Sequence, residues 1–139
     1  MKRAILLLFV LSFFFSCSDK EVKKVTEESL TAQEAFTVAE AIKDAYLNKN
    51  LSSIESNTTK ESYRELFGAI KSFDKASLTL SPKWVEIEKS TVSVKIAWDG
   101  TWVVRGKTTE EQGVAIFVFE GKPLKLSRIL KANPFRQPE

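Results

Sequence analysis

The only cysteine of the chain, Cys17, lies between an apolar run and a charged run near the N-terminus. A single thiol forms no intramolecular disulfide and cannot supply a cysteine-based zinc site. The sequence also contains no histidine, which removes the commonest general base at neutral pH and the commonest metal ligand. We therefore expect no metal and no cofactor, and the placement of Cys17 becomes the main chemical clue.

The residues before Cys17 are typical of a bacterial signal peptide, which we assign to residues 1–16. Residues 1–3 are a short positive segment, and residues 4–16 carry no charge but are fewer than the ~20 that a membrane-spanning helix needs. The segment "FFSC" resembles a lipobox, the processing site of bacterial lipoproteins. This resemblance implies cleavage between Ser16 and Cys17 and lipidation of Cys17. The alternative is an ordinary signal peptide with an incidental cysteine.

The residues after the signal indicate where the protein resides. Residues 17–30 are mostly charged or polar, and we expect a lipidated cysteine followed by a flexible tether. By resemblance to enterobacterial lipoproteins, Ser18 implies sorting to the outer membrane, facing the periplasm. Residues 19–21 also resemble surface-export signals of other bacteria, so both destinations stay open. The expected partners are the lipid bilayer and either an envelope protein or a small apolar ligand.

The composition indicates one globular domain, which we place at residues 31–139. The chain has 139 residues, of which 43% are apolar and 28% charged. Its 21 basic residues include Lys2 and Arg3, and it has 18 acidic residues, so the chain without its signal is nearly neutral. We therefore expect no nucleic-acid partner.

Two amphipathic helices are expected to open the domain. Thr31 and Glu34 fit a capping box, and apolar residues then recur with helical spacing up to Tyr46. Asn50 is expected to cap a short turn. Thr58 and Glu61 fit a second capping box, followed by a helix that we expect to end near Asp74.

Four or five antiparallel strands are expected to follow. Alternation of apolar residues changes parity at Pro82, which predicts a bulge, and residues 92–98 form the clearest strand. Asp99-Gly100 reads as a hairpin turn that places Trp98 across from Trp102. Residues 108–112 read as a loop, residues 114–119 as a strand buried on both faces, and residues 124–130 as the last strand. The fold class is α+β, with helices packed on one face of a bent sheet.

This order of elements resembles the cone-shaped, cystatin-like superfamily of nuclear transport factor two and ketosteroid isomerase. The stretches "AIKDAYLNKNLSSIES" and "LKLSRILKANPF" carry the resemblance, which covers residues 31–135. It implies a strongly bent sheet that encloses a pocket with the helices. Catalytic members of the superfamily use an aspartate or an aspartate–histidine pair in that pocket, whereas other members only bind a ligand.

Five aromatic side chains are the candidates for lining such a pocket: Tyr46, Tyr63, Trp84, Trp98 and Trp102. The simpler interpretation is that they fill the core or its edge. No aspartate falls on an apolar strand face, and a catalytic carboxylate with a raised pKa needs burial. We therefore expect a non-catalytic binding or scaffold module anchored in the cell envelope. The alternatives are an isomerase or dehydratase that uses a pocket carboxylate such as Glu86, and a structural envelope protein without a ligand.

Overall fold

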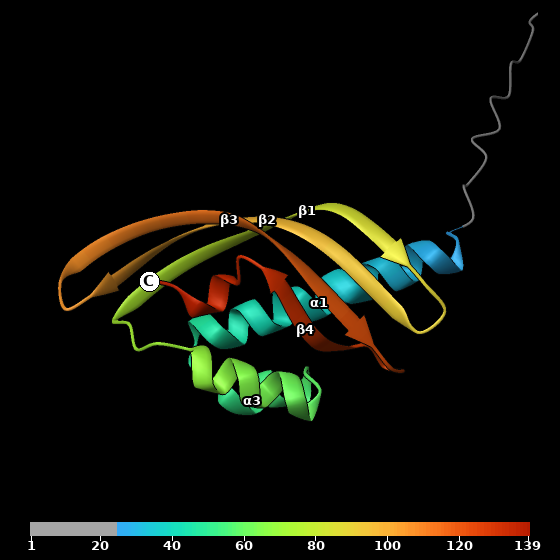
Figure 1. Ribbon diagram of the computed structural model, residues 1–139, viewed down its shortest axis with the longest axis horizontal. Coiled ribbons are helices and arrows are strands. Elements are labelled where there is room, and N and C mark those ends of the chain that lie inside the picture. The colour runs from blue at the N-terminus through green and yellow to red at the C-terminus, as the bar shows by residue number, and fades with distance from the viewer. Residues whose placement is uncertain (1–24) are drawn as a thin grey trace, which may run out of the picture.

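A four-stranded antiparallel sheet, in the order β1-β2-β3-β4, bends around a long helix in the computed structural model (Figure 1). The structure describes residues 25–139, so the predicted signal peptide and Cys17 lie outside the described residues. The helices are α1 (Glu27–Leu47), α2 (Leu51–Ser56) and α3 (Lys60–Ala69), with a 3₁₀ turn η1 (Pro134–Arg136) near the C-terminus. The strands are β1 (Lys75–Ile87), β2 (Thr91–Val104), β3 (Lys107–Glu120) and β4 (Lys125–Lys131).

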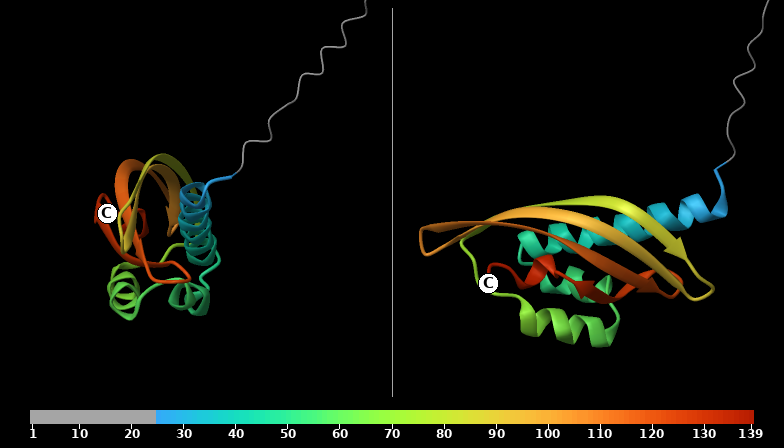
Figure 2. Two further views of the ribbon diagram at one scale, coloured as in Figure 1. Left: turned by 90° about the vertical axis from the view of Figure 1, so that its right-hand side faces the viewer. Right: turned by 45° about the horizontal axis from the view of Figure 1, so that its top comes forward.

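The α+β fold with helices on one side of a bent antiparallel sheet is thus confirmed, with three α-helices instead of two. Helix α1 lies along the concave side of the sheet, and α3 lies beneath the enclosed core in the end-on view (Figure 2). The core consists mainly of side chains from the inner face of the sheet and from α1, with further residues from α2, α3 and η1. Its largest fully buried members are Trp102, Tyr46, Phe117, Phe119 and Phe135.

Helix α1 begins earlier than the sequence pattern predicted. Thr26 is its N-cap, because the Thr26 side chain accepts a hydrogen bond of 3.1 Å from the backbone N–H of Ser29. Glu27 and Glu28 occupy the first turn, where negative charge stabilises a helix. The expected cap at Thr31 is therefore wrong, and residues 27–30 are helical rather than part of the tether.

The segment after α1 forms a second helix, α2, where the sequence predicts only a short turn. Asn50 caps it as expected, since its side chain accepts a hydrogen bond from the N–H of Ser53. The next cap is Thr59 rather than Thr58, whose hydroxyl instead donates to the carbonyl of Ile54 at 2.8 Å. Helix α3 ends at Ala69, well before the expected end near residue 74, and its C-cap Ile70 already has an extended backbone conformation.

The expected hairpin turn at Asp99-Gly100 is wrong, because β2 continues through both residues to Val104. The reversal comes at Arg105 and Gly106, which both have positive φ values, of 51° and 78°. Gly100 is required for packing instead: a Cβ on it would lie 2.4 Å from the Cη2 atom of the Trp102 ring. The expected loop at residues 108–112 is correspondingly part of β3, paired with the far half of β2.

Two other features of the sheet were expected from the sequence pattern. The register of β1 against β2 shifts between Pro82 and Trp84, which confirms the predicted bulge. In β3, three consecutive residues from Phe117 to Phe119 are buried, as expected for a strand covered on both faces. The start of that run departs from the expectation, since Val114 is 37% exposed.

Candidate functional site

Two of the predicted aromatic residues, Tyr46 and Trp102, meet in the interior of the cone. Tyr46 comes from the last turn of α1 and is 2% exposed, and Trp102 comes from β2 and is completely buried. The indole Nε1 of Trp102 donates a hydrogen bond of 2.8 Å to the phenolic oxygen of Tyr46. The Tyr46 hydroxyl lies 3.4 Å from the backbone carbonyl of Gln137, to which it donates. These contacts tie α1, the sheet and the C-terminal segment together.

Trp98 is also a core residue. Its indole Nε1 donates to the backbone carbonyl of Ala132 at 2.8 Å, and its ring lies edge-on to that of Trp102 with the centroids 6.4 Å apart. Because residues four apart on a strand share a face, Trp98 and Trp102 are neighbours along β2 rather than partners across a hairpin. The pair fills the core of the cone, which agrees with the simpler interpretation of these tryptophans rather than with a pocket lined by them.

Tyr63 and Trp84 lie elsewhere on the molecule. Tyr63 is half-buried on α3, where its ring centroid is 6.0 Å from that of the exposed Phe67. Trp84 stands at the bulge of β1 and is 50% exposed. The structure therefore does not bring the five predicted aromatic residues into one site.

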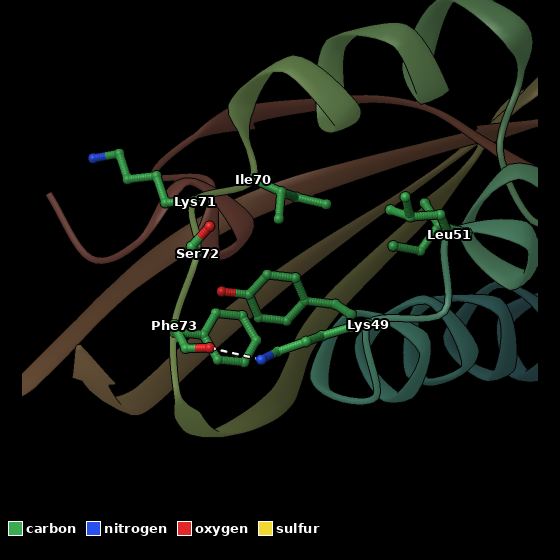
Figure 3. Close-up of a pocket in the computed structure, with 8 residues that line it drawn as sticks. Lys49, Leu51, Ile70, Lys71, Ser72 and Phe73 are labelled. Carbon is green, nitrogen blue, oxygen red and sulfur yellow. Dashed lines mark hydrogen bonds between the residues drawn. The ribbon is translucent and has the colours of Figure 1, made fainter. Parts of the chain in front are cut away.

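A small hollow of about 220 Å³ opens at the C-terminal end of α1, and we call it the helix-end pocket (Figure 3). The end of α1, the following helix α2, and the chain between α3 and β1 form its walls. Its lining residues are Tyr46, Lys49, Leu51, Ile54, Ile70, Lys71, Ser72 and Phe73. Of the predicted site residues only Tyr46 contributes to this lining. Most of the other lining side chains are aliphatic or aromatic.

The way in which α1 ends places Lys49 at this pocket. The N–H of Asn50 donates to the carbonyl of Ala45 and the N–H of Lys49 to that of Tyr46, which together form a Schellman motif. Lys49 occupies the left-handed position of the motif, with a φ of 57°, where glycine or asparagine is usual. The helix end thus turns the Lys49 side chain toward the segment that carries Phe73.

Two contacts with Phe73 hold the Lys49 ammonium group. Its Nζ donates a hydrogen bond of 2.7 Å to the backbone carbonyl of Phe73, drawn as the dashed line in Figure 3. The same nitrogen lies 5.0 Å from the centroid of the Phe73 ring, which is within cation–π distance. Lys71, the second lysine of the lining, points away from the pocket and donates to the carbonyl of Pro138 at 2.8 Å (Figure 3).

The Tyr46 phenol in the pocket lining keeps its proton at neutral pH. Burial raises the pKa of the Tyr46 phenol to about 12, and the hydrogen bond from Trp102 only partly offsets this effect. The ring of Tyr46 is further enclosed by Phe73 and Phe135, with centroids 5.2 Å and 5.1 Å away. Tyr46 therefore presents a neutral ring and hydroxyl rather than a phenolate base.

The carboxylate that the enzymatic alternative required is not found in the cone. Glu86 lies exposed on β1, so its assignment as a pocket carboxylate is wrong. No aspartate or glutamate between residues 25 and 139 is buried, and no cluster of three metal-ligating side chains exists in the same part of the chain. None of the helices described is long and apolar enough to cross a membrane.

The sequence reading missed Lys49 and Phe73. The sequence pattern marks neither as a site residue, since Lys49 follows the first expected helix and Phe73 falls within the second. A usable signal was present in "NKN", since an asparagine-flanked lysine after a helix is compatible with a left-handed helix end. Phe73 had no such signal, because its position depends on α3 ending early at Ala69.

Comparisons with known proteins identify the fold. No family model and no curated protein match the sequence. Among solved structures, an NTF2-like (nuclear transport factor 2) superfamily protein from Salmonella enterica serovar Typhimurium is similar with a TM-score of 0.63 and 15% identity, over 80% of this chain and 96% of that one. A conserved protein from Planctomyces limnophilus gives 0.58 and 10%, over 73% and 97%.

A third similar structure is an NTF2-like protein of unknown function from Shewanella oneidensis, with a TM-score of 0.51 and 11% identity over 70% of this chain and 95% of that one. Identities this low carry information on the fold alone. The expected resemblance in architecture is confirmed: the chain has the NTF2-like cone fold.

Proposed function

We propose that this protein is a lipid-anchored binding module of the bacterial cell envelope that holds a small, partly apolar ligand in the helix-end pocket without transforming it. The observation that carries the proposal is the pocket itself: apolar walls around a hollow of about 220 Å³, in a cone whose interior is otherwise filled by side chains. An engineered apolar cavity of about 150 Å³ is enough to hold benzene. A ligand with about one ring therefore matches the helix-end pocket in size.

The titratable side chains that line the pocket support a binding role rather than catalysis. General acid–base chemistry needs a titratable group within hydrogen-bond reach of the reacting atoms and a pKa near the working pH. The only titratable groups that line the pocket are Tyr46, whose pKa is raised to about 12, and the two lysines Lys49 and Lys71. Such a lining suits recognition of a ligand better than proton transfer at neutral pH.

The anchor is supported by the sequence of the N-terminal segment. The sole cysteine falls at the junction between the apolar run and the charged run, in a segment that resembles a lipobox. Stable membrane attachment takes two or more acyl chains, which lipoprotein processing of Cys17 supplies. With helix α1 beginning at Glu27, the link between Cys17 and the domain is short, so the domain would stay close to the bilayer, which we propose to be the outer membrane.

A second candidate function, a structural envelope protein without a ligand, is favoured by the packed interior around Trp98 and Trp102. The indole N–H signals separate the two candidates. The chain has three tryptophans, and the Trp102 indole N–H donates to the hydroxyl of Tyr46, which lines the pocket, whereas the Trp98 indole N–H donates to the backbone carbonyl of Ala132. In ¹⁵N-labelled full-length protein in lipid nanodiscs, benzamide should shift the Trp102 indole signal and leave that of Trp98 in place.

A matched pair of variants locates the binding. Ile70→Phe should reduce the volume of the pocket and abolish the benzamide shift, whereas Leu130→Phe, at a 44% exposed position of β4, should leave it intact. A benzamide titration without any shift of the Trp102 signal would contradict ligand binding and favour the structural role.

A separate experiment tests the proposed lipid anchor at Cys17. Replacement Cys17→Ala should release the protein from the membrane pellet and abolish incorporation of labelled fatty acid. Ser18→Ala is the control, because it retains the thiol and should stay in the pellet. Continued labelling of the Cys17→Ala protein would contradict the anchor and leave the binding proposal untouched.

A further inference from the structure

We infer that the helix-end pocket selects a small carboxylate: an apolar body that fits against the aliphatic and aromatic walls, with its carboxylate bound by the ammonium group of Lys49. This inference rests on the proposed ligand-binding function and names the class of ligand.

The charge of the lining separates this pocket from four other hollows on the described part of the chain. It has two lysines and no carboxylate, whereas each of those four hollows has at least one acidic side chain in its lining. Those acidic side chains include Glu65 beside α3, Asp99 on β2, Glu55 on α2 and Glu88 after β1. A pocket with a purely positive lining favours an anion over a neutral or cationic ligand of the same shape.

Lys49 has the donors that a carboxylate needs. An ammonium group has three N–H donors, and one of them is used by the carbonyl of Phe73 at 2.7 Å. The ion pairs in the described part of the chain involve Lys43 and Arg136 as their cations, so Lys49 has no acidic partner there. Its position is nevertheless fixed, by the carbonyl and by the ring of Phe73. The group is thus held at the rim before any ligand arrives, which lowers the entropic cost of binding.

The apolar walls of the pocket favour an organic carboxylate over inorganic phosphate. Ile54 is 1% and Phe73 6% exposed, and both lie with Ile70 and Leu51 around the hollow. Contact with such walls favours a ligand that has apolar surface to bury, whereas a phosphate ion would lose hydration there without compensating hydrogen bonds. Lys71, which points outward, adds positive potential without filling the space (Figure 3).

The test compares benzoate with benzamide, which share a ring and differ in charge. Titrations of the ¹⁵N-labelled full-length protein in lipid nanodiscs, followed by the Trp102 indole signal, should give a dissociation constant about tenfold lower for benzoate. Raising the salt concentration should reduce that advantage, because ions screen a partly exposed charge pair. Acetate and inorganic phosphate, which lack the ring, should bind much more weakly than benzoate.

Variants of Lys49 assign the effect to one side chain. In Lys49→Gln the tenfold preference should vanish while benzamide still binds, and in Lys49→Arg the preference should remain because the charge is kept. Lys107→Gln, at an exposed position on the first residue of β3, is the charge-matched control and should behave as the parent protein. The Trp98 indole signal reports in each variant whether the core is folded.

The outcomes distinguish the inference from the proposed function. If benzamide binds as tightly as benzoate, or if Lys49→Gln keeps the preference while folded, the carboxylate inference is overturned and the binding function stands. If phosphate competes as well as benzoate, the ligand class is overturned as well. If neither benzoate nor benzamide shifts the Trp102 signal, the proposed function fails together with the inference.

Discussion

The indole of Trp102 and the phenol of Tyr46 form the hydrogen bond that connects the sheet to the end of helix α1. The distance between Nε1 and the phenolic oxygen is 2.8 Å, and both side chains are almost completely buried. Tyr46 also lines the helix-end pocket, so one residue belongs both to the core and to the candidate binding site. Changes at this pair should therefore affect stability first and the pocket second.

Removal of the Tyr46 hydroxyl should destabilise the protein. In Tyr46→Phe the buried indole N–H of Trp102 loses its acceptor, and an unsatisfied buried donor costs about 1–3 kcal/mol. Urea unfolding followed by tryptophan fluorescence measures the free energy of unfolding. Tyr63→Phe is the matched control, because Tyr63 is only half-buried, and its effect should stay within about 0.5 kcal/mol. Equal effects of the two substitutions would contradict the role given to the Trp102–Tyr46 bond.

The stability should fall in alkaline solution because of Tyr46. Burial raises the pKa of Tyr46 from 10.0 to about 12, so the unfolded chain loses the phenolic proton before the folded protein does. The stabilisation is complete below pH 10 and is lost between about pH 10 and pH 12, by about 2–3 kcal/mol in total. Urea unfolding at several pH values between 9 and 12 measures this loss. Tyr46→Phe should lose less stability over the same interval, whereas Tyr63→Phe should retain the full dependence.

The sequence was sufficient to predict the elements that depend on local patterns. Helical spacing of apolar residues predicted α1, and the change of parity at Pro82 predicted the bulge in β1. The resemblance to the cone superfamily correctly implied the bent sheet. The helix caps were misplaced by the sequence pattern because a single hydrogen bond decides each of them: the caps are Thr26 rather than Thr31, and Thr59 rather than Thr58.

The candidate site was less predictable, because it depends on contacts between distant segments. Tryptophans on the inner face of a sheet, such as Trp98 and Trp102, can either line a pocket or fill a core, and the sequence pattern is the same in both cases. The packing of α1 against the sheet determines which of the two occurs. Lys49 contacts Phe73 because of how α1 ends and where the chain between α3 and β1 runs. No local sequence pattern specifies the path of that chain segment. The turn predicted at Asp99-Gly100 is wrong for a related reason. The ring of Trp102 leaves no room for a side chain at position 100, so the glycine is explained by packing and not by a turn.

The role given to Gly100 can be tested directly. Gly100→Ala should destabilise the protein by about 1–3 kcal/mol, since its Cβ would lie 2.4 Å from the Cη2 atom of Trp102 and 2.9 Å from the carbonyl oxygen of Ser77. Gly68→Ala is the matched control on α3, where nothing lies within 4 Å of the added methyl group. There the replacement should be neutral or stabilise by up to about 1 kcal/mol, because alanine favours helix. Thermal unfolding of both variants gives the comparison, and an unaffected Gly100→Ala protein would contradict the packing argument.

Two threonines, Thr26 and Thr31, are alternative N-cap residues for α1, and the structure assigns the cap to Thr26. Thr26→Ala removes the side chain that accepts from Ser29, and the loss of such a cap costs about 1 kcal/mol of helix stability. We expect faster hydrogen exchange at the backbone amide of Ser29 and fraying of the first turn, which lies next to the predicted tether. Thr31→Ala should leave that exchange unchanged or slow it, since Thr31 lies within the helix and alanine has the higher helix propensity. If instead Thr31→Ala accelerates exchange and Thr26→Ala does not, the helix starts where its sequence pattern alone had placed it, and the tether is longer than the structure indicates.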